Sequence, residues 1–421
     1  MDFNSFKNDL AKLIKYNSVQ TSPAENAPFG KQNAECLKEF LALASSFGFQ
    51  TKNYEGYAGE VVFGNGKDLG ILCHLDIVPA GDKTLWNSDP FTLTEKDGKL
   101  FGRGVLDDKG PALIILYALK ELKDKGFVPK RKIRLILGCN EETGWGCIEY
   151  LKNHELMCEE GFSPDSDFPV IYAEKGIVHA KLFFDCDKSL LSVKGGTAYN
   201  MVCDKVEALC PVNEKLLKKY DLSFLDGKII STGKTAHGSL PHKGKNAILK
   251  ILPYFEDMGL LDKSVRQNLF ENASGILNYF DDSGNLTLSP DVISLENGKL
   301  AVIIDIRYPA LMDFEKVKRE IDKIAPNEIL SHQKSLYTDK NSKLVKTLCS
   351  VYNDVCKEEK SPIAIGGGTY ARALKNGVAF GPCFKQEDAV CHEINEYFKV
   401  EDVKKAFAVY AKAIVLLTEK E

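Results

Sequence analysis

A histidine and a carboxylate two residues apart, His74 and Asp76, follow an apolar run that begins at Gly70. Residues two apart on a strand point to the same face, so the imidazole and the carboxylate would be presented together at the strand's end. Neutral imidazole is a favoured ligand of zinc and similar cations, and a nearby carboxylate can orient the ring. The pair alone is weak evidence for a metal site, so its interpretation depends on the other polar motifs.

Two pairs of adjacent acids occur further along the chain. Asp107 and Asp108 stand between glycines and the start of a predicted helix, where they could be metal ligands or an ordinary helix cap. Glu141 and Glu142 follow an apolar strand. Neighbouring carboxylates repel each other unless a cation or a proton intervenes, so one acid could bind metal while the other transfers protons. An exposed, solvated loop is the alternative for the second pair.

Asp165, Asp167 and His392 complete the set of candidate ligands. Most of these motifs lie at the carboxyl ends of predicted strands or directly before predicted helices, where open α/β sheets place their sites. Two histidines with three or four carboxylates suit a pair of divalent cations that share one carboxylate. The residues therefore predict a two-metal hydrolase.

The elements that would position these residues change in character along the chain. Alternating short apolar runs and amphipathic stretches predict an α/β domain with a mixed sheet flanked by helices, and a region of strands with helices on one side predicts an inserted α+β domain. The predicted domains are 1–175, 176–334 as the insertion, and 335–421 as the second part of the first domain. The predicted strands are 69–73, 133–137, 170–173, 177–184, 189–193, 227–232 and 300–306, and the predicted helices are 3–14, 36–43, 111–122, 147–151, 204–220, 246–258, 314–324, 342–355 and 400–417.

Composition narrows the class of partner. A chain of 421 residues is expected to form two domains, and its net charge of −4, without a basic run longer than 129–132, argues against nucleic acid. No apolar stretch approaches the ~20 residues that a membrane span needs. The amphipathic N-terminus lacks a signal-peptide core, so we expect a cytoplasmic, reducing location, with the twelve cysteines as core thiols rather than zinc ligands.

Four segments together resemble the PepV-like dipeptidases, in the co-catalytic metallopeptidase family that also contains aminoacylases and succinyl-diaminopimelate desuccinylase. They are residues 74–82, 102–111, 140–144 and 164–169, and further similar motifs occur at 200–202, 235–241, 306–309 and 366–372. The resemblance covers nearly the whole chain. Two departures, Cys203 in place of a usual proline and Cys391 before the last histidine, bear on the size and specificity of the substrate pocket rather than on the metal ligands.

The resemblance implies a role for each candidate ligand. Asp107 would bridge two metal ions, zinc in first place and manganese in second, and would be followed by a cis peptide bond to Asp108. His74 and Asp165 would complete one metal site, and Glu142 and His392 the other. Asp165 matches the family's Pro-Asp position, with Asp167 as its alternative. Glu141 would be the general base for the attacking water, and Asp76 would orient His74.

The inserted domain would act as a lid over the substrate. His237 and Asn200 would stabilise the developing oxyanion, Arg307 would bind a peptide's C-terminal carboxylate, and Gly367 and Gly368 would let the backbone approach the substrate. The expected partner is a small peptide. We expect a monomer, because a lid built from two similar halves would not need a second subunit, although a dimer stays open.

Two alternatives follow from the same residues. An N-acyl-amino-acid deacylase would need the same metals and Arg307 but no recognition of a free amine, so an acidic subsite near Asp82 or Asp108 would favour the dipeptidase. A catalytically silent relative would bind peptide or metal without cleavage.

Overall fold

The computed structural model describes residues 1–269, 271–272 and 274–419. The chain forms two compact units. Unit 1 contains Met1–Tyr172, Tyr337–Ile363 and the chain from Thr369 onward, and unit 2 contains Ala173–Leu336 and Ala364–Gly368. Within the described residues, no helix combines the length and the apolar character required to cross a bilayer.

A nine-stranded mixed sheet forms the centre of unit 1. Its strands are β1 (Gln50–Tyr54), β2 (Ala58–Phe63), β3 (Asp68–His74), β6 (Lys132–Gly138), β7 (Glu160–Ser163), β9 (Ile171–Glu174), β20 (Leu336–Tyr337), β21 (Ile363–Ile365) and β22 (Asn376–Ala379). They lie in the order β1-β2-β6-β3-β7-β22-β9-β20, and β21 pairs with β9. The boundaries between the two units fall within β9, β20 and β21, so part of each of these strands is counted with unit 2. β3 is parallel to β6 and β7, whereas β1 and β2 are antiparallel. Every residue of β3 from Leu69 to His74 is buried, as expected for a central strand covered on both faces.

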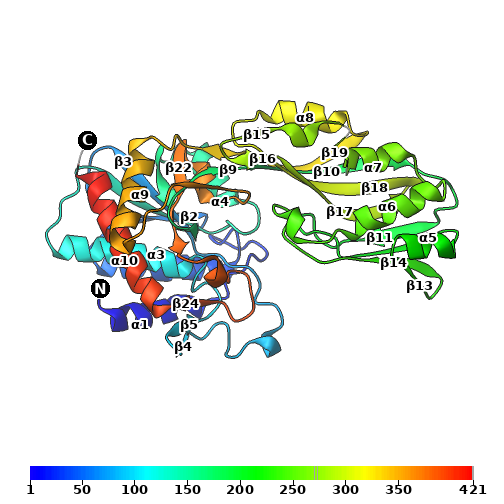
Figure 1. The fold of residues 1–421 in the computed structure, drawn as a ribbon. Coiled ribbons are helices and arrows are strands. Elements are labelled where there is room, and N and C mark those ends of the chain that lie inside the picture. The colour runs from blue at the N-terminus through cyan, green and yellow to red at the C-terminus, as the bar shows by residue number, and fades with distance from the viewer. Residues whose placement is uncertain (270, 273, 420–421) are drawn as a thin grey trace. The chain divides into compact units, whose positions relative to one another are not determined.

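Small sheets and helices surround this sheet. The smaller sheets consist of β8 (Ser166–Asp167) with β23 (Pro382–Cys383), and of β4 (Thr94–Lys96), β5 (Lys99–Phe101) and β24 (Tyr397–Lys399). The helices are α1 (Phe3–Ile14), α2 (Lys31–Ser46), α3 (Lys109–Asp124), α4 (Gly146–Asn153), α9 (Lys343–Cys356) and α10 (Val400–Thr418). α10 packs against α3 and α9, which lie beside it in Figure 1, and α2 packs against β1 and β2. α3 is buried without interruption from Lys109 to Leu119, so it is a core helix rather than an amphipathic surface helix.

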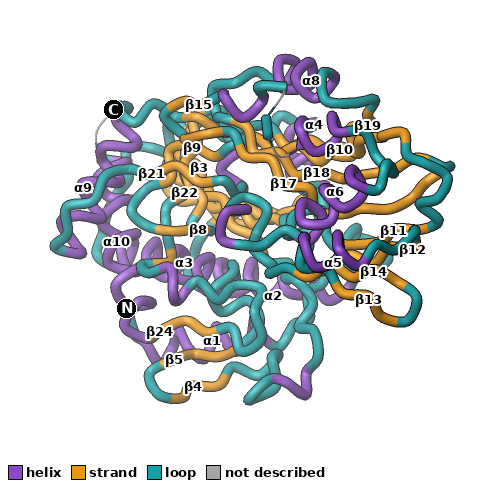
Figure 2. The backbone as a smooth tube through the Cα atoms, turned by 45° about the vertical axis from the view of Figure 1, so that its right-hand side comes forward, coloured by secondary structure: helices purple, strands orange, loops and turns teal. Residues whose placement is uncertain are grey.

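Unit 2 is built on one eight-stranded antiparallel sheet. Its strands are β10 (Gly176–Asp185), β11 (Ser192–Gly195), β12 (Lys205–Leu209), β13 (Ser223–Leu225), β14 (Lys228–Thr232), β17 (Thr287–Glu296), β18 (Lys299–Tyr308) and β19 (Asn327–Gln333). They lie in the order β13-β14-β12-β11-β17-β18-β10-β19. The helices are α5 (Glu214–Lys219), α6 (Ala247–Asp257), α7 (Lys263–Leu269) and α8 (Phe314–Asp322), and a short hairpin joins β15 (Phe280–Asp281) to β16 (Gly284–Asn285). α6 packs against β12, β14 and β17 (Figure 2). The predicted fold class, an α/β unit with a mixed sheet and an inserted α+β unit, is confirmed.

The predicted helix at 204–220 is wrong. The segment forms strand β12, a loop that contains Pro211, and the short helix α5. Within β12, Val206 and Ala208 are buried whereas Lys205 and Leu209 are exposed, a period of two that belongs to a strand. Pro211 cannot donate a helical hydrogen bond, and Asn213 starts a new helix by accepting the N–H groups of Lys215 and Leu216.

Candidate metal centre

Three adjacent parallel strands, β6, β3 and β7, end at the same edge of the unit 1 sheet. His74 is the last residue of β3, Glu141 and Glu142 follow β6, and Asp165 follows β7. Because the carboxyl ends of parallel strands meet at one edge, residues distant in sequence are brought together there. The prediction that these motifs gather at strand ends agrees with this arrangement.

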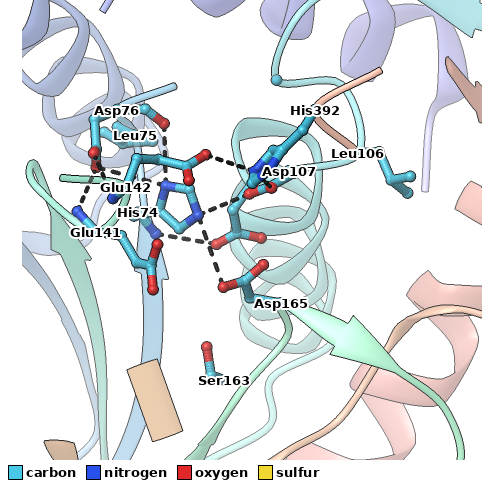
Figure 3. Close-up of polar contacts among 12 residues, drawn as sticks. His74, Leu75, Asp76, Leu106, Asp107, Glu141, Glu142, Ser163, Asp165 and His392 are labelled. Atoms are coloured by element: carbon cyan, nitrogen blue, oxygen red, sulfur yellow. Dashed lines mark hydrogen bonds and ion pairs between the residues drawn. The ribbon is translucent and has the colours of Figure 1, made fainter. Parts of the chain in front are cut away.

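Asp107 lies two residues before the start of α3 and faces His74 (Figure 3). Its Oδ1 is 2.8 Å from His74 Nε2, and Asp165 Oδ2 is 3.8 Å from the same nitrogen. Both His74 Nε2 and Asp107 Oδ1 are buried, and among the described residues neither has a partner aligned as a hydrogen bond. Two buried ligand atoms that point at one place without bonding each other fit a cation between them.

The second oxygen of Asp107 faces His392. Oδ2 of Asp107 is 2.9 Å from His392 Nε2, and Glu142 Oε1 is 3.1 Å from the same nitrogen. The Asp107 carboxylate therefore lies between a His74–Asp165 group and a His392–Glu142 group (Figure 3). Ligand atoms of His74, Asp107 and Glu142 all lie within 4.8 Å of one another.

The carboxylates of this cluster are buried close together, an arrangement that a bound positive charge would stabilise. Burial and the charge of Asp107 raise the pKa values of Asp165 and Glu142. Burial alone would lower the pKa of His392, but its contacts with Asp107 and Glu142 outweigh burial and raise that pKa to about 11. Burial would raise the pKa of Asp107, and its contacts with His392 and His74 instead hold it below its usual range. Mixed imidazole and carboxylate donors around a shared carboxylate suit two divalent cations.

Glu141 has the properties of a proton acceptor. Burial raises the pKa of its carboxyl to about 8, and the nearby Glu142 and Asp76 act in the same direction, although His74 opposes them. In Figure 3, Glu142 is joined to His392 by a dashed line, whereas the carboxyl group of Glu141 lies away from that contact. A carboxyl group that titrates near neutral pH can accept a proton in one step and donate it in the next.

Asp76 connects the histidine to the acid pair. Its Oδ1 accepts the N–H of Glu141 at 3.0 Å, and its Oδ2 accepts the N–H of Glu142 at 3.1 Å. The ring nitrogen Nδ1 of His74 lies 3.5 Å from Asp76 Oδ1 and 3.0 Å from the Asp76 carbonyl oxygen. The predicted contact with His74 is present, but its predicted cause is wrong: β3 ends at His74, and Asp76 reaches the ring from the loop beyond it.

Asp108 is neither a side-chain helix cap nor an exposed acid. Its side chain makes no capping bond to α3, and its Oδ2 accepts the N–H of His74 at 3.0 Å. It is fully buried, so its own carboxylate is not exposed to a substrate amine. Asp82 is exposed and caps the short helix η1 (Lys83–Leu85). The peptide bond between Asp107 and Asp108 is cis, as expected.

Asp167, the alternative to Asp165, lies in β8. It pairs with Cys383 of β23, and burial raises the pKa of its carboxyl. The carboxylate near His74 is that of Asp165.

Unit 2 holds the remaining predicted site residues. Asn200 and His237 are neighbours, because the Asn200 carbonyl accepts the N–H of Gly238 at 2.7 Å and His237 forms a bridge with Met201. His237 Nδ1 lies 2.7 Å from the Ser239 hydroxyl.

Arg307 is held by acceptors on two segments of unit 2. Its Nε and Nη2 each donate to Asp305 at 2.7 Å, and its Nη1 donates to the carbonyl of Gly366 at 2.9 Å. Gly366 belongs to the short segment Ala364–Gly368, so Gly367 and Gly368 are part of unit 2 as well.

Two supports of the centre were missed in the sequence. Tyr370, in η4 (Tyr370–Ala373), packs edge-on against His74 with ring centroids 5.9 Å apart, and its hydroxyl lies 2.6 Å from Cys147 Sγ. Asn140 accepts the N–H of Gly146 at 2.9 Å and thereby closes the turn that carries the acid pair. An asparagine two residues after a strand is a turn signal that could have identified the second of these.

Comparison of the sequence and the fold with known proteins finds similarity to peptidases. Residues 70–415 match the model of "Peptidase family M20/M25/M40". The chain is 34% identical to YtjP of Bacillus subtilis (strain 168) over 98% of this chain and 96% of that protein. It is 33% identical to Beta-Ala-Xaa dipeptidase of Lactobacillus delbrueckii subsp. lactis, again over 98% and 96%. The M20 family metallo-carboxypeptidase Sso-CP2 of Sulfolobus solfataricus has a similar fold, with a TM-score of 0.63 at 18% identity and 100% coverage of both chains.

Proposed function

The chain belongs to peptidase family M20/M25/M40, and from this membership we propose that it is a metal-dependent dipeptidase that cleaves short peptides with a free C-terminal carboxylate. The observation that carries the proposal is the Asp107 carboxylate, whose two oxygens face His74 on one side and His392 on the other. The full-length similarity to Beta-Ala-Xaa dipeptidase supports a dipeptide as substrate.

Five residues would hold two divalent cations, zinc in first place and manganese in second. Asp107 would serve both cations, with His74 and Asp165 on one side and Glu142 and His392 on the other. When bound, such cations polarise the scissile carbonyl and lower the pKa of the attacking water.

Glu141 would act as the general base and then as the general acid. Its carboxylate would take the proton of the attacking water and pass it to the leaving amine. Its pKa near neutrality supports both steps. Asp76 would keep Glu141 in place through the Glu141 N–H while it orients the ring of His74.

The inserted segment 176–334, between domain parts 1–175 and 335–421, would act as a lid. His237 and Asn200 would donate to the oxyanion that forms on the scissile carbonyl. Arg307 would bind the substrate carboxylate. A guanidinium has five N–H groups, and in the described part of the chain Asp305 and Gly366 engage three of them, which leaves one on each Nη for a bidentate contact. Gly367 and Gly368 would let the backbone approach the substrate.

The working form would be a monomer in the cytoplasm that acts on small peptides. The twelve cysteines support a reducing compartment, since all are free and nine of them are buried, with Cys186, Cys356 and Cys391 partly exposed.

Paired substrates test the proposal. A panel of α-dipeptides and β-Ala-Xaa dipeptides, matched with N-acetyl derivatives of the same C-terminal amino acids, should show turnover of the dipeptides with added zinc or manganese. Turnover of the acetylated compounds alone would assign the chain as a deacylase, and no turnover with metal bound would assign it as a silent relative.

Glu141→Gln tests the mechanism. The variant keeps the shape and the backbone contact to Asp76 but cannot accept a proton, so kcat should fall by about 10²–10⁴-fold. Metal content measured by elemental analysis should match the wild type. Unchanged kcat would remove Glu141 from its assigned role.

A further inference from the structure

Glu396 is a fully buried carboxylate four residues beyond His392. It accepts the N–H groups of Gly104 at 3.1 Å, Leu106 at 2.9 Å and Asp107 at 3.3 Å on one oxygen. Its other oxygen lies 2.7 Å from Nη1 of Arg103, whose side chain is also buried. A carboxylate with this many donors is fully satisfied, which a buried charge requires.

These contacts join the chain segments that carry the candidate ligands. One segment, residues 102–107, ends with Asp107, and the other runs from His392 to Glu396. The Glu396 carbonyl accepts the N–H of Gly102 at 3.2 Å, so main chain and side chain both link the two segments. Arg103 Nη2 reaches the His392 carbonyl at 3.3 Å and the Pro79 carbonyl at 3.4 Å, which adds the loop beyond His74.

His392 needs such support for its own backbone. Its φ is 67°, in the left-handed region that a residue with a side chain seldom adopts. A local conformation of this kind persists only where its surroundings hold it. The bond from Arg103 to the His392 carbonyl acts directly on that peptide group.

A buried ion pair is not by itself a device for stability, because apolar residues of similar volume often serve as well. The charged pair instead makes directed contacts: the carboxylate accepts three N–H groups of the Asp107 segment, and Nη2 of Arg103 donates to two carbonyls of other loops. Changing either partner would shift the segments that present Asp107 and His392 to the same place.

We propose that Glu396 and Arg103 are positioning residues that fix the Asp107 and His392 side chains relative to each other and thereby set the affinity of the His392–Glu142 side for its cation. The inference rests on the proposed function, since it assigns these two residues to the same metal centre.

Glu396→Gln tests this against a matched control. Glu60 of β2 also forms a buried ion pair in unit 1, with Arg134 of β6, and these two residues are 6% and 7% exposed against 0% for Glu396 and 2% for Arg103. Glu60→Gln therefore makes the same chemical change away from the metal ligands. Zinc content after dialysis against a graded series of chelator buffers, and the rise in melting temperature caused by zinc, are measured for both variants and the wild type.

We expect Glu396→Gln to bind one of two zinc ions about 10–100-fold more weakly, in line with other groups that support metal ligands. Glu60→Gln should lower the melting temperature of the metal-free protein and leave zinc affinity unchanged. Wild-type zinc affinity for both ions in Glu396→Gln, or an equal loss in Glu60→Gln, would overturn the inference.

Arg103→Lys serves if Glu396→Gln does not fold. Lysine keeps the charge toward Glu396 but lacks the second nitrogen that reaches the His392 and Pro79 carbonyls, so zinc affinity should fall in the same direction by a smaller factor. Unchanged affinity would overturn the inference. A wild-type protein that binds two zinc ions without cleaving any dipeptide would refute the proposed function and leave this measurement valid, whereas one that binds no zinc would refute both.

Discussion

Asp76→Asn should reduce catalysis by loosening the turn that carries Glu141 and Glu142. The wild-type carboxylate accepts one backbone N–H from each of these residues, at 3.0 and 3.1 Å. Asparagine has one oxygen, so it can keep one bond while its NH₂ group meets the other N–H, donor against donor. A hydrogen bond to a charged group contributes about 1.5–3 kcal/mol, so we expect a loss of about 2 kcal/mol.

If the whole of this loss raises the free energy of the transition state, kcat/KM falls by roughly 30-fold, since each 1.36 kcal/mol is a factor of about ten. The assay is hydrolysis of a dipeptide at saturating metal, with metal content measured in parallel. Asp281→Asn is the control: Asp281 also bonds two backbone N–H groups with its two oxygens, those of Ser283 and Leu311, but in unit 2. A kcat/KM for Asp76→Asn within about twofold of that for Asp281→Asn would refute this account of Asp76.

Two further predictions concern stability. Burial and the neighbouring Asp305 raise the pKa of Asp291 from 3.8 to about 8, with Ser289 and Arg307 opposing. Because the folded pKa lies above the unfolded one, the stability that this group supports is complete below about pH 4 and is lost as the pH rises toward 8. Asp291→Asn should remove that part of the decline in melting temperature with pH. Melting temperatures of the variant and the wild type that stay parallel from about pH 5 to about pH 9 would contradict this prediction. In Gly138→Ala, the new Cβ would lie 2.2 Å from the Tyr370 hydroxyl oxygen, so the ring that packs on His74 must move. We expect a loss of about 1–3 kcal/mol in denaturant unfolding with reduced zinc affinity, and wild-type values for both would show that the ring has room.

The candidate site was largely predictable because it is built from local signals. His74 and Glu142 follow apolar runs and Asp107 precedes a predicted helix, and the rule that parallel strands share an edge brings the strand-end residues together. His74, Glu142 and Asp165 are brought to one edge in this way. The neighbours of each ligand were harder: Glu396 contacts the Asp107 segment across 289 residues of chain, and within its own segment it looks like an ordinary exposed loop acid.

The errors in the fold have a similar origin. The segment 204–220 contains helix-forming residues, and its buried positions alternate over only five residues of β12 before Pro211 intervenes. A signal this short does not outweigh local propensity, and pairing with β11 and β14 decides the outcome. Asp76 shows the converse case, since a loop produced the contact that had been expected from a strand.

The position of β22 between β7 and β9 has a consequence for the protein's synthesis. β22 is translated after the whole inserted segment of unit 2, so the central sheet of unit 1 stays incomplete while unit 2 leaves the ribosome. His392 follows Asp165 by 227 residues, a delay of roughly 10–45 s at about 5–20 residues per second. A nascent chain therefore carries the three candidate carboxylate ligands, Asp107, Glu142 and Asp165, before His392 is made, and the proposed metal centre can be completed only after residue 392 has been added.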